Sequence, residues 1–242
     1  MGRACAYVLL SGGVDSTTCL YLARKQFGDV VGLSVDYGQR HKKEIEYAQK
    51  SCRKLGVVHR VLDLSSVVPR TVLTDPGAPI PKVSYEEIQG VSPTYVPFRN
   101  GLLLSAATAH VVGARESLKR VLQEGSAPIG LPEWGLYFGA HAEDAHNWAY
   151  PDCTPEFIGA MANAIFVGTY REVRLHTPLE WLGKAAIVRL GEELGVDWSL
   201  TWSCYFGGEV HCGECPTCRA RQAGFAATRV ADPTAYLRRP AA

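Results

Sequence analysis

The stretch LLSGGVDSTT, residues 9–18, follows a short apolar run, CAYVLL, and precedes a stretch of helical character. Two adjacent glycines let the backbone turn sharply and approach an anion closely, and the start of a helix favours phosphate. The hydroxyls of Ser11, Ser16 and Thr17 can donate to that phosphate, and Asp15 can hold a magnesium ion that bridges its oxygens. The lysine and spacing of the common P-loop are absent. The stretch therefore predicts a phosphate site at a strand-to-helix turn, with an ordinary turn capped by Asp15 or Ser16 as the alternative.

Strand and helix signals alternate through the first third of the chain. We predict a buried strand at 5–10 and further strands at 30–38 and 57–65, with helices at 15–27 and 41–55 between them. This order is typical of a parallel sheet with right-handed crossovers, in which ligands bind beyond the carboxyl ends of the strands. SGGVDS and DYGQRH both occupy that edge, so we expect them to share a site.

The rest of the chain continues the pattern after a long interruption. Residues 67–97 hold six of the 14 prolines, and we predict a long loop there that is mobile without ligand and able to act as a lid. Further predictions are a helix from Asn100 to about Val112, a second polar helix at 115–123, a loop at 124–135 and a strand at 136–140. A helix from Pro155, a strand at 172–179 and an amphipathic helix ending at Gly195 follow.

Composition limits the function classes. The chain has 242 residues, of which 47% are hydrophobic and 20% charged, as in an ordinary globular protein with one main domain. We place an α/β domain at 1–199 and a zinc-binding region packed on it at 200–242. Lys and Arg number 25 against 24 Asp and Glu, which argues against a nucleic acid partner. No apolar run approaches the roughly 18–20 residues of a membrane span, so we expect a cytoplasmic protein.

Four of the eight cysteines crowd into the C-terminal region, in the pattern C-x7-C-x2-C-x2-C. Four thiolates in such close spacing suit a tetrahedral, closed, structural zinc site. The predicted ligands are Cys204, Cys212, Cys215 and Cys218. An iron–sulfur cluster is the main alternative, and a set of reduced surface cysteines is the other.

Several motifs together resemble a known family. SGGVDS is similar to the S-G-G-x-D-S signature of the ATP pyrophosphatases, whose loop holds the pyrophosphate end of ATP. That loop combines, in order, with LSVDYGQRH, YVPFRN, YPDC-PEF and LTWSCYFGGEVHCGECPTC, and the set resembles the 7-cyano-7-deazaguanine synthases of queuosine biosynthesis. The resemblance runs from about Tyr7 to Ala227. It implies an adenine nucleotide alpha hydrolase-like fold and a homodimer.

The resemblance also implies an activity and a set of functional residues. The activity is an ATP-dependent carbon–nitrogen ligase that adenylates 7-carboxy-7-deazaguanine and uses ammonia to form the nitrile, with release of AMP and pyrophosphate. ATP and magnesium would be held by Leu10, Ser11, Gly12, Gly13, Val14, Asp15, Ser16, Thr17, Ser34 and Val35. Catalysis would fall to Ser11, Asp15, Ser16 and Arg99. Substrate would be bound by Tyr37, Gln39, Arg40, Asn100, Asp144, Tyr150 and Asp152. The alternatives are that QRH starts a helix and that Arg99 and Asn100 cap one.

The sequence departs from the family pattern where the substrate or nucleophile should lie. His141 stands in place of an Asn, two extra residues separate Asp144 from Tyr150, RNG replaces R-N-T, and the connection at 115–135 is long. These changes leave open a related enzyme, of the kind associated with bacterial defence systems, that joins the deazaguanine carboxylate to a protein amine and stops at an amide. A tRNA-binding modification enzyme and a non-catalytic zinc module are the remaining alternatives.

Overall fold

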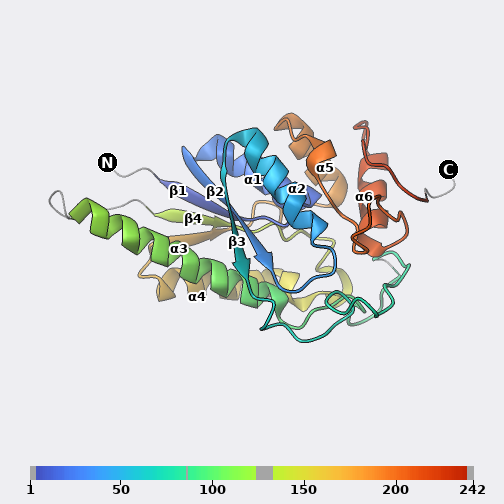
Figure 1. Ribbon diagram of the computed structural model, residues 1–242, viewed down its shortest axis with the longest axis horizontal. Coiled ribbons are helices and arrows are strands. Elements are labelled where there is room, and N and C mark those ends of the chain that lie inside the picture. The colour runs from blue at the N-terminus through green and yellow to red at the C-terminus, as the bar shows by residue number, and fades with distance from the viewer. Residues whose placement is uncertain (1–3, 86, 124–132, 239–242) are drawn as a thin grey trace.

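A computed structural model describes residues 4–85, 87–123 and 133–238 of the chain (Figure 1). Five strands form one sheet: β1 (Cys5–Leu9), β2 (Asp29–Asp36), β3 (Val58–Asp63), β4 (Trp134–Tyr137) and β5 (Val173–His176). Their order is β3-β2-β1-β4-β5, and every neighbouring pair is parallel. The predicted parallel-sheet α/β fold is confirmed. The winding direction reverses between β1 and β4, and the carboxyl ends at such a switch point are where this fold binds ligands.

Helices cover both faces of the sheet (Figure 1). They are α1 (Val14–Gln26), α2 (Lys43–Leu55), α3 (Arg99–Gln123), α4 (Pro155–Gly168), α5 (Lys184–Glu193) and α6 (Pro216–Ala226), with short 3-10 turns at His146–Trp148, Pro151–Cys153 and Trp198–Leu200. Successive residues of β1 point to opposite faces. Ala6 and Val8 therefore enter the core with α1, α2 and α5, whereas Tyr7 and Leu9 enter the core with α3 and α4. This explains why β1 is apolar throughout.

Three expectations about the elements need correction. The two predicted helices at 100–112 and 115–123 are one continuous helix, α3. Gly113 lies between them in open space, where an added Cβ would meet nothing within 4 Å, and a glycine within a helix costs only about 1 kcal/mol. Strand β4 begins at Trp134, within the predicted loop at 124–135, and strands β4 and β5 end earlier than predicted, at Tyr137 and His176. Helix α6 in the cysteine-rich region was not expected; it begins at Pro216, where proline suits the first turn. Most of the predicted loop at 124–135 lies outside the described residues.

The segment 67–97 has no helix or strand among its described residues, as predicted, but it is well packed. Leu73, Ile80, Ile88 and Val96 are buried, each in a small apolar cluster. The guanidinium of Arg40 donates hydrogen bonds to the carbonyls of Asp75 and Ala78, at 3.3 and 2.6 Å. The segment lies below the C-terminal region in Figure 1. Its mobility stays a prediction.

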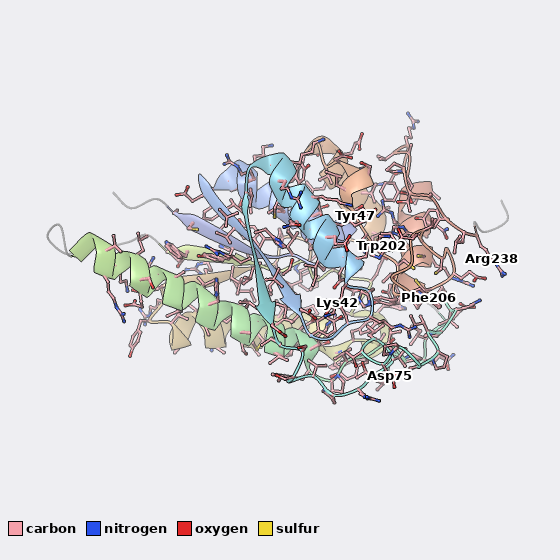
Figure 2. The ribbon with its side chains drawn as sticks, viewed as in Figure 1. Lys42, Tyr47, Asp75, Trp202, Phe206 and Arg238 are labelled. Carbon is pink, nitrogen blue, oxygen red and sulfur yellow. The ribbon has the colours of Figure 1, made fainter. Side chains whose placement is uncertain are left out.

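The cysteine-rich region packs on the main domain. Figure 2 shows Tyr47 of α2 beside Trp202, with ring centroids 5.3 Å apart. The buried Arg221 of α6 pairs with Asp232 at 3.0 Å and donates to the carbonyl of Trp198. Among the described residues, no helix combines the length and the apolar character needed to cross a membrane.

Candidate active site

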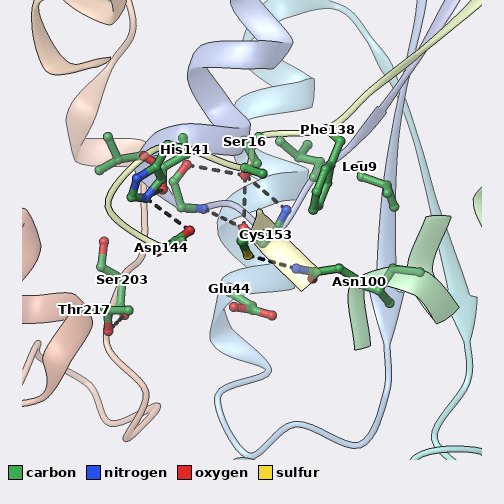
Figure 3. Close-up of a pocket in the computed structure, with 18 of the residues that line it drawn as sticks. Leu9, Ser16, Glu44, Asn100, Phe138, His141, Asp144, Cys153, Ser203 and Thr217 are labelled. Atoms are coloured by element: carbon green, nitrogen blue, oxygen red, sulfur yellow. Dashed lines mark hydrogen bonds and ion pairs between the residues drawn. The ribbon is translucent and has the colours of Figure 1, made fainter. Parts of the chain in front are cut away.

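A pocket of about 220 Å³ opens at the switch point of the sheet (Figure 3). Its wall combines the loop after β1, the end of β2, the starts of α2 and α3, the segment after β4, and the cysteine-rich region. The predicted residues that line it are Leu10, Ser11, Gly13, Val14, Asp15, Ser16, Ser34, Val35, Tyr37, Arg99, Asn100, Asp144 and Tyr150. The predicted residues outside this lining are Gly12, Thr17, Gln39, Arg40 and Asp152. Their roles in binding and catalysis stay predictions.

The glycine loop leaves the start of α1 free for an anion. Gly13 is the N-cap of α1, and no side chain caps it, so the alternative of a turn capped by Asp15 or Ser16 is not what the structure has. The two serine hydroxyls, Ser11 Oγ and Ser16 Oγ, lie 3.0 Å apart, and Ser16 Oγ also accepts from the backbone N–H of Ser11 at 3.1 Å. Uncapped N–H groups beside paired hydroxyls suit a phosphate.

Lys184 lines the pocket and was not among the predicted site residues. It begins α5, just after β5, and its Nζ donates to both carboxylate oxygens of Asp15, at 2.7 and 2.8 Å. The same Nζ lies 2.9 Å from His141 Nε2, which lies 3.2 Å from Asp144 Oδ2. Burial by itself would raise the pKa of Asp15, but Lys184 and His141 hold it below its ordinary value. The position of Lys184 at the carboxyl end of a parallel strand was the available signal.

A second set of polar and charged side chains lies near the starts of α2 and α3. It comes from residues 39–44 and from Arg99. Glu44 lines the pocket, and burial raises the pKa of its carboxyl to about 7, against the opposing effects of Gln39 and Arg99. Gln39 Nε2 donates to Glu44 Oε1 at 3.0 Å and to the carbonyl of Val35, so Gln39 holds Glu44 in place. His41 is 3% exposed, and burial, with Arg99 and Arg40, lowers its pKa to about 3. His41 is therefore neutral near pH 7.

Asp152 caps a helix. Its Oδ2 accepts from the backbone N–H of Asn100 at 2.9 Å, at the start of α3, and its carbonyl accepts from Asn100 Nδ2 at 3.1 Å. Asn100 Nδ2 also donates to Cys153 Sγ, a contact drawn in Figure 3. Tyr150 reaches the long segment, where its hydroxyl lies 3.0 Å from Ser92 Oγ. These contacts fix the loop after β4 against α3.

The four predicted zinc ligands come together. The Sγ atoms of Cys204, Cys212, Cys215 and Cys218 all lie within 4.8 Å of one another. Zinc–sulfur bonds of about 2.3 Å in a tetrahedron place sulfurs slightly under 4 Å apart, so the set fits a single ion. A four-iron cluster would hold its cysteine sulfurs farther apart. Residues around these cysteines also line the pocket, among them Ser203, Tyr205 and Thr217.

Comparison with known proteins agrees with this arrangement. The family model described as "Queuosine biosynthesis protein QueC" matches residues 5–122 and 133–229. A 7-cyano-7-deazaguanine synthase of Caldicellulosiruptor bescii is 39% identical, covering 96% of each chain, and one of Methanoregula boonei is 37% identical, covering 96% of this chain and 98% of the other.

Similarity to solved structures is more distant. The U34-tRNA thiolase NcsA of Methanococcus maripaludis, with its [4Fe-4S] cluster, has 18% identity and a TM-score of 0.43, covering 81% of this chain and 59% of that one. The NH3-dependent NAD synthetase of Campylobacter jejuni has 13% identity and a TM-score of 0.36, covering 83% and 67%. The extended sequence match, together with the serine-rich loop and the four gathered cysteines, shows that this chain belongs to the QueC family of queuosine biosynthesis proteins, the 7-cyano-7-deazaguanine synthases.

Proposed function

We propose that this protein is an ATP-dependent carbon–nitrogen ligase that converts 7-carboxy-7-deazaguanine and ammonia to 7-cyano-7-deazaguanine. The observation that carries the proposal is the ion pair of the buried Lys184 with Asp15, beside the uncapped start of α1, within a pocket that Arg99 also lines. The Lys184–Asp15 pair and the start of α1 suit the phosphates of a nucleotide, and Arg99 suits a second, acidic substrate.

The chemistry proceeds by activation of a poor electrophile. A carboxylate oxygen of the substrate attacks the α-phosphorus of ATP, and pyrophosphate leaves. Ammonia then attacks the acyl carbon and loses a proton, AMP leaves, and an amide forms. A second ATP activates the amide oxygen, and loss of AMP with the remaining amide protons gives the nitrile.

The chain's own residues would stabilise charge and orient groups during these steps. The N–H groups at the start of α1 and the hydroxyls of Ser11 and Ser16 would bind the leaving pyrophosphate. Lys184 would neutralise charge that develops between the α and β phosphates, a type of stabilisation that often dominates catalysis. Bound magnesium would supply further positive charge to the phosphate oxygens, with Asp15 as its protein ligand.

The metal at the four cysteines is proposed to be zinc, with a structural role. Four protein sulfurs leave no open coordination position, so the ion would not act on substrate. It would hold the loop that carries Ser203 and Tyr205 against the pocket. Reduced cysteines and the use of ATP suit the cytoplasm, and a homodimer remains our expectation from the family.

Mass spectrometry of a reaction with zinc-loaded protein, ATP, magnesium, 7-carboxy-7-deazaguanine and ammonium tests the proposal. We expect a product of nitrile mass, with two AMP and two pyrophosphate for each nitrile. The Lys184→Met variant should release AMP about a hundredfold or more slowly than wild type. Absence of AMP with every component present would refute the proposal.

A different acceptor is the second candidate, and His141 is the observation that favours it. This residue replaces the Asn of the family pattern and contacts Lys184 directly, so the departure lies within the candidate site itself. AMP release that stalls at an adenylate or amide in the reaction above would support an enzyme that joins the carboxylate to a protein amine.

A further inference from the structure

We infer that Glu44 and Arg99 read the hydrogen-bonding edge of the deazaguanine ring, with Glu44 accepting from N1–H and the 2-amino group and Arg99 donating to O6. The inference rests on the proposed function and names the residues that select its substrate. A guanine-type edge presents two donors beside one acceptor. A carboxylate next to a guanidinium offers the complementary acceptors and donors.

Glu44 is a pocket carboxylate with an oxygen available to a ligand. Its Oε1 accepts from Gln39, whereas Oε2 lies 3.4 Å from His41 Nε2 and accepts no hydrogen bond from the described residues. Of the other pocket carboxylates, Asp15 binds Lys184 through both oxygens, and Asp144 contacts His141 through Oδ2.

Arg99 keeps further donors for a ligand. Its Nε donates to Asn100 Oδ1 at 3.2 Å, and its guanidinium also hydrogen-bonds the hydroxyl of Tyr37, whereas no carboxylate of the described residues pairs with it within 4 Å. Its guanidinium carbon lies 5.9 Å from the centroid of the Tyr37 ring, which orients the group. Arginine donors of this kind suit a carbonyl oxygen on a flat ring.

The surroundings suit a flat, aromatic ligand. Tyr37, His41 and Tyr205 line this end of the pocket, and the rings of His41 and Tyr205 lie 5.3 Å apart. The Nδ1 atom of His41 is buried and has no partner among the described residues. A buried polar atom without a protein partner is unusual in a folded protein, so we expect a water or a ligand to contact it.

A comparison of two ligands with two proteins tests the inference. Calorimetry measures binding of 7-carboxy-7-deazaguanine and of 7-carboxy-7-deazahypoxanthine, which lacks only the 2-amino group, to zinc-loaded wild type and to Glu44→Gln. In wild type, loss of the amino group should weaken binding about tenfold or more. In Glu44→Gln, the deazaguanine should bind about 10- to 100-fold more weakly, and the two ligands should differ by less than about threefold. Glu46→Gln, exposed on the same helix, is the matched control and should resemble wild type.

The outcomes separate this inference from the proposed function. Equal binding of both ligands to wild type, or an equal loss of affinity for both in Glu44→Gln, overturns the reading of the edge by Glu44 and leaves the proposed function standing. Wild type that binds ATP but neither ligand overturns the proposed function and the inference with it. If Glu44→Gln does not fold, Glu44→Asp replaces it, because the shorter carboxylate should lose most of the preference for the amino group.

Discussion

Glu44→Gln should make the free protein more stable at alkaline pH while it removes substrate selection. Burial raises the pKa of the Glu44 carboxyl to about 7, whereas an exposed glutamate titrates near about 4.3. Because the folded-state value is the higher one, the native state binds more protons than the unfolded state between these values. Stability therefore falls as the pH rises from about 4.3 to 7 and then stays constant. At about 1.4 kcal/mol for each pKa unit, ionised Glu44 costs roughly 4 kcal/mol above pH 7.

Glutamine keeps the acceptor for Gln39 but carries no charge, and its amide group needs a partner that the carboxylate did not. We therefore expect the free energy of unfolding to rise by roughly 1–3 kcal/mol at pH 8 and to change little or fall slightly at pH 5. Urea denaturation with zinc and a reducing agent present, at both pH values, measures this. Glu46→Gln should stay within about 0.5 kcal/mol of wild type at each pH. A loss of stability in Glu44→Gln of the same size at pH 5 and pH 8 would refute the reasoning, since Glu44 would then act as a simple structural hydrogen-bonding group.

Other perturbations have equally definite outcomes. Replacing Lys184 with Met should lower the rate of AMP release by about a hundredfold or more, measured by chromatography, because a buried charge at the phosphates is lost. Cys218→Ser should reduce bound zinc well below one equivalent in metal analysis, whereas Cys52→Ser, outside the cluster, should leave it unchanged. Asp232→Asn should lower the free energy of unfolding by about 3–5 kcal/mol, measured with urea, because it leaves a buried arginine without its charge partner. Affinity for 7-carboxy-7-deazaguanine should rise several-fold from pH 6 to pH 8 as Glu44 ionises, and calorimetry should find no such rise in Glu44→Gln.

The sequence predicts those parts of the site whose residues lie close together along the chain. Paired glycines after a buried strand, and four cysteines at short intervals, restrict the local backbone so strongly that their grouping could be predicted. Lys184 could not be assigned in this way, because its contact with Asp15 joins residues 169 positions apart through the order of the strands. Asp152 also shows that a residue type alone does not reveal contacts between distant parts of the chain. Its residue type suited substrate binding, but only the packed structure reveals that its carboxylate caps α3.

One glycine connects the two ends of the pocket with the metal site. Gly12 has a positive φ of 81°, and a Cβ there would collide with the carbonyl oxygen of Glu44, so the phosphate loop turns directly against the first turn of α2. The carbonyl of Gly12 accepts a hydrogen bond from the backbone N–H of Trp202 at 2.8 Å, two residues before the ligand Cys204. Gly207 of the cysteine loop packs just as closely against the segment before α2, since a Cβ there would lie 2.9 Å from the Cα of His41. The phosphate loop, the proposed reader of the base and the cysteine loop thus meet backbone to backbone, with little room for one to shift alone. A structural metal at the four cysteines, as proposed, would therefore fix the geometry of a site that it does not touch.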